Sequence, residues 1–158
     1  MSIMAEYREL YGQFKFIVSI DGVQSAGFEK CSEVGITIET MKYHEGGCLV
    51  PYKEPGLGDC EDLTLNRGMS RDHDLYDWLL DCLNIMAKLP GGISVAPPSY
   101  FRDMTIRQRR RDDVPAINFR IYWAFVTSYK GGPWDNSASG VTMDTVTVAY
   151  HHPDRQTA

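Results

Sequence analysis

The sequence predicts a mostly β protein: an antiparallel β-sandwich or barrel-like subunit with one α-helix packed on it. Three observations carry this prediction. Apolar residues alternate with polar ones in several separate segments, which is the period of a half-buried strand. Turn residues divide these segments at short intervals, as they do between antiparallel strands. Only one segment has the spacing of a helix. We expect a single domain over residues 1–158, with short flexible ends at 1–10 and 152–158.

The first strand is expected over residues 14–20, because apolar side chains occupy almost every second position. Lys15 and Ser19 belong to its polar face. Asp21-Gly22 follows at once and is typical of a tight hairpin turn. Residues 23–28 are therefore expected to return as the second strand of this hairpin.

A further strand is expected over residues 34–43, again from an alternating pattern. Ile36 and Ile38 are expected on its buried face, and Thr37 and Glu39 on its polar face. The same alternation therefore predicts a strand with one face against the core.

A long loop is expected over residues 44–62, because Gly46-Gly47 ends the preceding strand and Pro and Gly recur after it. A loop of this length inside a compact domain usually has a function. The short strand at residues 63–65 follows, and Gly68 closes it.

The helix is expected to begin after Ser70 or Asp72, either of which can cap its N-terminus. Asp74 and Asp77 then lie in its early turns, where the helix dipole favours negative charge. The apolar residues that follow recur at helical spacing and form one face. Pro90-Gly91-Gly92 ends the element, and an extended linker is expected over 90–101. The residues of this helix expected to pack in the core are Leu75, Trp78, Leu79 and Leu83.

Two strands are expected at residues 104–108 and 118–129, joined by a charged turn at 109–113. One face of the longer strand should carry Phe119, Ile121, Trp123 and Phe125. The other face is only moderately polar, so it is expected either to be covered or to meet another subunit.

The last strand is expected over residues 142–151. Its apolar positions change phase by one near Asp144-Thr145. A change of this kind predicts a bulge or a bend at that point.

The sequence offers little for catalysis, for a metal or for a cofactor. No Gly-x-Ser-x-Gly elbow is present, and the spacing of His44 and Cys48 across a Gly-Gly turn does not fix a ligand geometry. The four cysteines form no Cys-x-x-Cys motif and are expected to be free thiols. A net charge of −5 argues against a dedicated nucleic-acid binder. We therefore expect neither an enzyme nor a cofactor, and no catalytic or metal site.

The order of these motifs resembles the tail tube protein family of contractile phage tails and related contractile injection systems. The resemblance covers nearly all of the chain from Phe14 to Tyr150. The segments that carry it are Phe14 to Ile20, Asp21-Gly22, Gly27-Phe28, Tyr43 to Gly47, Pro55-Gly56, Leu63 to Gly68, Leu75 to Leu79, Ala124 to Tyr129, Gly132-Pro133, Asn136 to Ser139 and the final strand from Thr142.

The resemblance implies a structural subunit that forms hexameric rings, whose strands join into one ring-shaped inner β-barrel. Stacked rings would make a hollow conduit for DNA or protein cargo, which passes through without specific binding. Implied partners are further copies of the chain and the tail sheath, baseplate or spike and tail terminator proteins. Assembly is expected in the bacterial cytoplasm, in a phage tail or an injection particle, without membrane insertion.

Two groups of residues are candidates for assembly on this basis. The first group would contact the next ring, and it consists of His44, Glu45, Gly46, Gly47, Tyr52, Pro55, Gly56 and Asp59. The second group would face the lumen, where polar and weakly binding side chains let cargo slide, and it consists of Thr37, Glu39, Lys15, Ser19, Thr145 and Thr147.

Three alternatives remain open at this point. The basic run Arg109 to Arg111 and the segment Cys48 to Cys60 depart from the expected family pattern, which favours a specialised tube-initiator or adaptor ring at the baseplate. A small-ligand-binding monomeric β-barrel would instead have an apolar cavity. An enzyme with an unrecognised site is the third possibility.

Overall fold

The computed structural model describes residues 10–23, 27–87 and 100–157. In this part of the chain, strands predominate and one helix follows the fifth of them, which confirms the predicted fold class. The elements, in chain order, are β1 (Phe16–Ile20), β2 (Phe28–Cys31), β3 (Ile36–Tyr43), β4 (Tyr52–Cys60), β5 (Leu63–Gly68), α1 (Asp74–Ala87), β6 (Arg102–Arg109), β7 (Pro115–Gly131), β8 (Met143–Ala149) and β9 (His152–Thr157).

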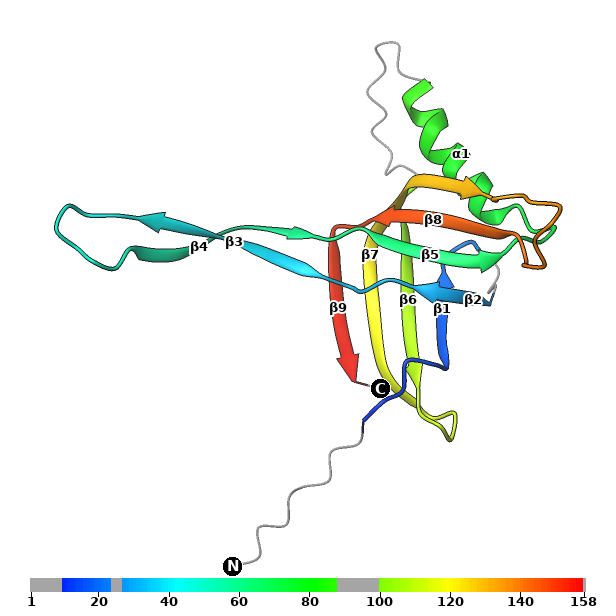
Figure 1. The fold of residues 1–158 in the computed structure, drawn as a ribbon, viewed down its shortest axis with the longest axis horizontal. Helices are drawn as coiled ribbons and strands as arrows, with labels where there is room; N and C mark the ends of the chain where they lie inside the picture. Colours follow the sequence, from blue (N-terminus) through cyan, green and yellow to red (C-terminus); the bar gives the residue numbers. More distant parts are fainter. Residues whose placement is uncertain (1–9, 24–26, 88–99, 158) are drawn as a thin grey trace, which may run out of the picture.

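The strands form two antiparallel layers that share β7, a strand of 17 residues. The first half of β7 pairs with β6 and β9, and β1 pairs with β6, which makes sheet A. The second half of β7 pairs with β8, and β5 and β2 follow, which makes sheet B. Figure 1 shows the strands of the two sheets crossing at a large angle. A closed barrel is not seen in the single subunit.

β7 can join both sheets because it bends at Trp123. This residue has a φ of 55°, and the register with β6 shifts at the same place. Ile121 is fully buried before the bend and Ala124 after it. The inward positions therefore change from odd-numbered to even-numbered residues at the bend. The prediction that Trp123 shares the buried face with Ile121 is therefore wrong, because Trp123 is 59% exposed.

The core lies between the two sheets and continues under the helix. Sheet A contributes Val18, Ile20, Met104 and Ile121, which are all buried. Sheet B contributes the inward side chains of β5 and β8, namely Leu63, Leu65, Val146 and Val148. Each fully buried aliphatic side chain stabilises the fold by about 1.5–3 kcal/mol relative to an exposed one.

Helix α1 packs on β7 through its first turns. Leu75 and Trp78 are buried, and Leu79 is half-buried, as predicted. The indole Nε1 of Trp78 donates a hydrogen bond to the carbonyl oxygen of Tyr100 at 2.7 Å, so its polar atom is satisfied. Leu83 was predicted to pack as well, but it is 51% exposed, because the end of α1 extends past the sheet (Figure 1).

A buried ion pair joins β5, β8 and the segment before α1. Arg67 and Asp144 are 2% and 3% exposed, and the Nε of Arg67 lies 3.8 Å from Oδ2 of Asp144. Arg67 Nη2 also donates to the carbonyl oxygen of Asp72 at 3.0 Å, and the Tyr129 hydroxyl donates to Asp144 Oδ1 at 2.8 Å. Asp144 thus takes an inward position of β8, which corrects the predicted bulge: the strand keeps its phase, and a charged residue occupies one core position.

Three further predictions about the elements are wrong. Residues 44–62 are not a loop, because Tyr52–Cys60 form β4 and pair with β3. The strand predicted over 23–28 is not the hairpin partner of β1 in the described residues: Val23 forms only an isolated bridge with Ile20, and Phe28 belongs to β2, which pairs with β5, whereas β1 pairs with β6. The tail from residue 152 is not free, because it forms β9 on the edge of β7.

The strands predicted at 14–20, 34–43, 63–65, 104–108, 118–129 and 142–151 are confirmed apart from their ends. β1 begins at Phe16 rather than at residue 14, and β8 ends at Ala149 rather than at residue 151. The predicted flexible residues 1–10 and the linker 90–101 lie almost entirely outside the described residues.

We predict that Trp78→Ala lowers the free energy of unfolding by about 3–5 kcal/mol, because it removes a fully buried indole and leaves a cavity. Leu83→Ala on the same helix is the matched control, and it should cost about 0.5 kcal/mol or less because Leu83 is half exposed. Urea unfolding followed by circular dichroism measures both. Equal losses for the two variants would contradict the orientation of α1.

Burial, together with the hydrogen bond to Asp144, raises the pKa of Tyr129 to about 12. The folded protein therefore holds this proton more tightly than the unfolded chain, whose tyrosines titrate near 10. The stabilising effect is complete below about pH 10, and we predict its loss as the pH rises from about 10 to 12. The readout is the unfolding free energy of the wild type against that of Tyr129→Phe. Parallel pH curves for the two proteins would refute the assignment.

Candidate assembly surfaces

The strands β3 and β4 continue the strands β2 and β5 as one long two-stranded ribbon. β2 pairs with β5 inside sheet B, and β3 pairs with β4 outside it. Between the two halves, the amide of Glu61 donates to the carbonyl oxygen of Gly35 at 2.9 Å, so the pairing does not stop. Figure 1 shows the outer half projecting far from both sheets. We call residues 36–60 the arm.

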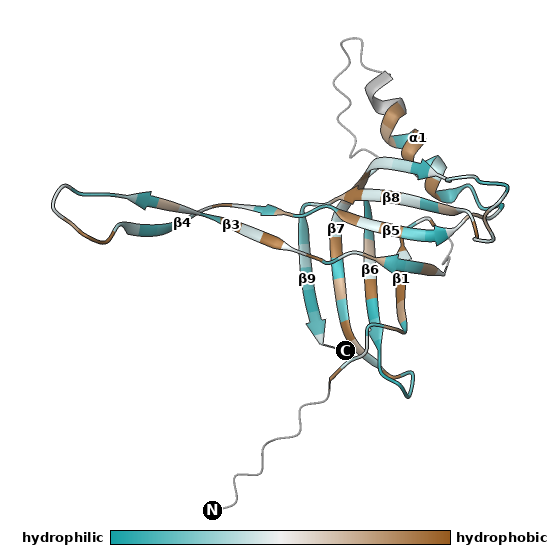
Figure 2. Cartoon of the chain, viewed as in Figure 1, coloured by the Kyte–Doolittle hydropathy of each residue, from teal (hydrophilic) through white to brown (hydrophobic). Residues whose placement is uncertain are grey.

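The arm exposes an unusual amount of apolar surface. Every residue of β3 is exposed, so the predicted burial of Ile36 and Ile38 is wrong in the single subunit. A lone two-stranded hairpin is only marginally stable in water. Large exposed apolar patches mark sites of interaction, and Figure 2 shows apolar segments along the arm. The exposed large apolar residues of the arm are Ile36, Ile38, Met41, Tyr43, Leu49, Val50, Tyr52 and Leu57.

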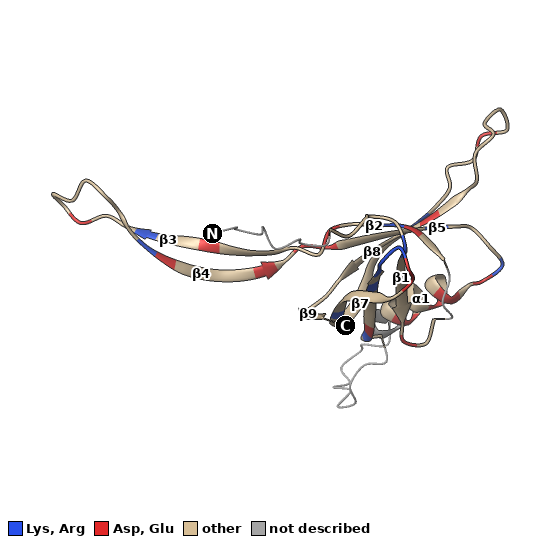
Figure 3. Cartoon of the chain, turned by 90° about the horizontal axis from the view of Figure 1, so that it is seen from below, with Lys and Arg blue, Asp and Glu red and all other residues tan. Residues whose placement is uncertain are grey.

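The sequence of the arm separates its charges onto two faces. Lys42 lies directly opposite Lys53, and side chains alternate between the faces of a strand. Glu54 pairs with Met41, and Asp59 pairs with Thr37, so the acids fall on the other face together with Glu39. We call these the lysine face and the acidic face. Figure 3 shows both signs of charge along the arm.

The acidic face of the arm continues the outer surface of sheet B. Cys60 packs against the core and lies opposite Ile36, so the lysine face continues the inward side of the sheet. The opposite face must then continue the outer side, where Thr145 and Thr147 lie between inward residues of β8. Thr64 is paired with Thr147 and adds a further hydroxyl to that surface.

Four of the six predicted lumen residues are therefore brought onto one surface: Thr37, Glu39, Thr145 and Thr147. The other two are not. Ser19 lies on the outer side of sheet A, because its neighbours Val18 and Ile20 point into the core. Lys15 precedes β1, with a φ of 65°, and its ammonium group is used in a local ion pair.

The residues predicted to contact another ring divide between the tip and the second strand of the arm. His44, Glu45, Gly46 and Gly47 form the tip with its turn, where Gly47 has a φ of 97° that favours glycine. Tyr52, Pro55, Gly56 and Asp59 lie in β4. Pro55 and Gly56 sit at the register shift between β3 and β4, where a missing amide and a missing side chain are tolerated.

Sequence reasoning missed Lys42 and Lys53, which face each other near the end of the arm. A signal was available. Tyr43 and Tyr52 are placed symmetrically about the glycine turn, and cross-strand aromatic pairs are common in antiparallel ribbons. This pairing was not recognised because the second strand contains Pro55, Gly56 and Gly58, and proline and glycine are depleted in strands.

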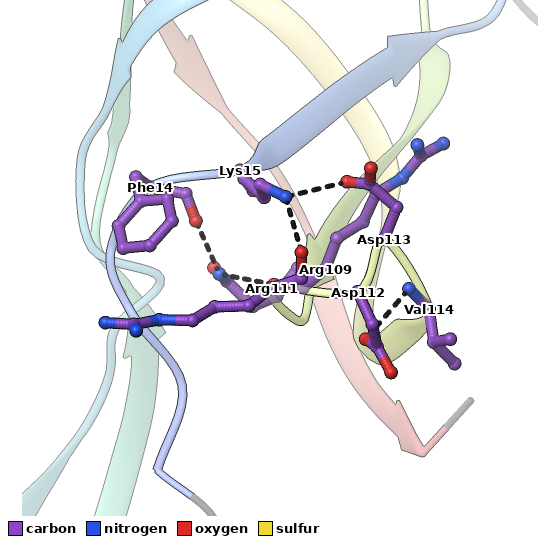
Figure 4. Close-up of polar contacts among 8 residues, drawn as sticks. Phe14, Lys15, Arg109, Arg111, Asp112, Asp113 and Val114 are labelled. Atoms are coloured by element: carbon purple, nitrogen blue, oxygen red, sulfur yellow. Dashed lines mark hydrogen bonds and ion pairs between the residues drawn. The ribbon is translucent and has the colours of Figure 1, made fainter.

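The charged turn between β6 and β7 ties down the chain before β1 (Figure 4). Lys15 Nζ donates to the carbonyl oxygen of Arg111 at 2.7 Å and lies 3.2 Å from Oδ1 of Asp113. Asp112 accepts a hydrogen bond from the amide of Val114 at 3.3 Å. Both acids of the turn therefore have local roles, as expected for a charged turn.

The described residues do not form an arrangement suited to catalysis. No group of three or more His, Cys, Asp or Glu side chains within them could hold a metal ion. The four cysteines are free, and burial raises the pKa of the Cys31 thiol to about 11, which keeps it protonated and a poor nucleophile. In the same part of the chain, no helix has the length and apolar character to cross a membrane.

Comparison with known proteins agrees with the fold. The family model of the T4-like virus tail tube protein gp19 matches residues 12–153. A search of curated protein sequences finds no match.

Three solved structures have the same fold along nearly their whole length. The cap of the anti-feeding prophage, described as a tube terminating cap, has a TM-score of 0.78 at 21% identity, and covers 100% of both chains. A sheath-tube complex of an extracellular contractile injection system gives 0.74 at 21% identity, over 98% of this chain and 95% of that one. The anti-feeding prophage baseplate gives 0.77 at 15% identity, over 96% and 98%.

The family model matches most of the chain, and the family is one of structural proteins rather than enzymes. This favours an assembly subunit over the monomeric ligand-binding barrel. The chain belongs to the family of the T4-like virus tail tube protein gp19, and it is a structural tube subunit.

Proposed function

We propose that this subunit closes into hexameric rings that stack into the inner tube of a contractile tail or injection particle. The observation that carries the proposal is the arm, because its exposed apolar residues need a partner and it is too far from the subunit's own core to find one. The edge strands β1, β2 and β9 also offer unpaired backbone groups to neighbouring subunits. Ring closure satisfies such edges, and contact of the arm with the next ring covers its apolar surface.

The outer surface of sheet B, together with the acidic face of the arm, forms the wall of the channel in this proposal. It presents hydroxyl groups and carboxylates, of which Thr145 and Glu39 are representative, and Met41, Tyr43 and Tyr52 share the acidic face near the end of the arm. Hydroxyls bind weakly, and carboxylates repel phosphate groups, so DNA or an acidic protein slides past such a wall without sticking. Cargo therefore passes without specific binding.

The partners of the tube in this proposal are a sheath around it, a baseplate or spike below it and a terminator above it. The similar structures support this set, since they come from a cap, a sheath-tube complex and a baseplate. Rings assemble in the bacterial cytoplasm and leave it within the finished particle. A ring that starts the tube at the baseplate is the second candidate, and the likeness to the baseplate chain supports it.

We predict that replacing residues 37–59 with a short Gly-Ser linker leaves a folded subunit that no longer stacks. None of the removed residues is buried, so circular dichroism and the melting temperature should stay close to the wild type. Negative-stain microscopy and sedimentation detect rings and tubes. Full-length tubes from this variant would refute the role of the arm.

A density map of the assembled tube tests the channel wall directly. We expect Thr37, Glu39, Thr145 and Thr147 to line the channel, and Ser19 to lie on the outside. A map with Ser19 in the channel and Thr147 on the outer wall would mean that sheet A, and not sheet B, forms the inner barrel.

A further inference from the structure

An open cleft of about 810 Å³ lies where sheet A and sheet B come apart, between their edge strands β1 and β2. Its floor is apolar and is formed by Phe16, Ile106 and Phe119. Its rim carries four carboxylates and one lysine, Lys30. The four acidic residues are Glu29, Glu33, Glu61 and Asp62.

The four acids are exposed and have no ion-pair partner within 4 Å among the described residues. Such a concentration of like charge repels itself in the free subunit. An apolar floor with an acidic rim has the chemistry to accept a segment that is apolar and positively charged.

The lysine face of the arm is such a segment. Lys42 and Lys53 are directly opposite each other, and like charges in this position destabilise a strand pair. Neither lysine has a carboxylate within 4 Å in the described part of the chain. Ile36 and Ile38 share their face, so the arm combines apolar side chains with an uncompensated positive pair.

We propose that the lysine face of the arm of one subunit docks on the acidic cleft of a second copy of this chain. This rests on the proposed function and names the two surfaces that meet when rings stack. The two lysines lie opposite the rim acids, and the isoleucines and the aliphatic stems of the lysines cover apolar surface beside the floor.

The subunit cannot make this contact with itself. Glu33 and Glu61 stand at the base of the arm, whereas Lys42 lies about 30 Å further along the ribbon at the rise of an extended strand. The contact therefore joins the end of one arm to the base of the next. A contact between two different surfaces does not close on a pair of molecules, and when it joins one ring to the next it repeats along an open stack.

Charge reversal tests the proposal. Lys42→Glu with Lys53→Glu should raise the protein concentration needed for tubes about tenfold or more, since close charge pairs across an interface couple strongly. Glu33→Lys with Glu61→Lys should have the same effect. All four changes together should restore tubes at close to the wild-type concentration. Arg71→Glu, at an exposed position before α1 that belongs to neither surface, is the matched control and should leave stacking unchanged.

Carbodiimide cross-linking gives a second readout, because it joins a lysine to a carboxylate in direct contact. In wild-type tubes, we expect peptides that link Lys42 or Lys53 to Glu33, Glu61 or Asp62, and no such peptides in dispersed subunits. Tubes that link these lysines only to other carboxylates would overturn the proposal. So would normal stacking of the Lys42→Glu, Lys53→Glu variant, or failure of the four-fold variant to recover while it remains folded.

The two proposals fail in different ways. If the wild-type chain forms neither rings nor tubes, the proposed function is refuted, and the docking contact with it. If the wild type stacks and the charge-reversed variants stack equally well, only the docking contact is refuted.

Discussion

The fold depends on one strand serving both sheets. β7 hydrogen-bonds to β6 and β9 in its first half and to β8 in its second half, and α1 packs on it. The bend that allows this puts Trp123 at a positive φ, which costs about 1–3 kcal/mol for a bulky residue. Contacts on both sides hold the bend in place. The amide of Trp123 donates to Asp103 Oδ1 at 3.2 Å, and its carbonyl oxygen lies 3.0 Å from Nδ1 of His151.

The interior and the arm differ in how well their side chains are enclosed. Inside, even the charged pair Arg67 and Asp144 is enclosed, and it ties sheet B to the segment that leads into α1. Removing one partner of such a pair leaves the other charge buried and uncompensated, which is costly. Among the described residues, no layer lies above or below the arm, and the pairing of β3 with β4 orders it within the subunit. The subunit is thus a packed body of two sheets with one extension whose apolar residues are exposed.

Sequence patterns predicted an element correctly where the spacing of its apolar residues matched the spacing of its buried positions. β1, β6 and α1 followed from alternation or helical spacing, because each has one face on a single core. The patterns failed where that condition did not hold. β4 contains Pro55, Gly56 and Gly58, so no local propensity predicts its pairing with β3. Asp144 is a charged residue at an inward position of β8, so it interrupts the apolar period. The pattern could not reveal this, because its partner Arg67 is distant in sequence. The candidate lumen residues divided for a related reason, since alternation identifies the polar face of each strand but not the sheet to which the strand belongs.

The marginal stability of the arm has a kinetic consequence. If the arm docks on a neighbour as proposed, it loses conformational entropy, and this loss opposes the first contacts until a complete interface offsets it. Spontaneous initiation is then slow, whereas addition to an existing end, where receptive surfaces are already arrayed, is fast. Growth of this kind shows a lag that seeding abolishes. Free subunits can therefore accumulate without forming stray polymers until a template starts them.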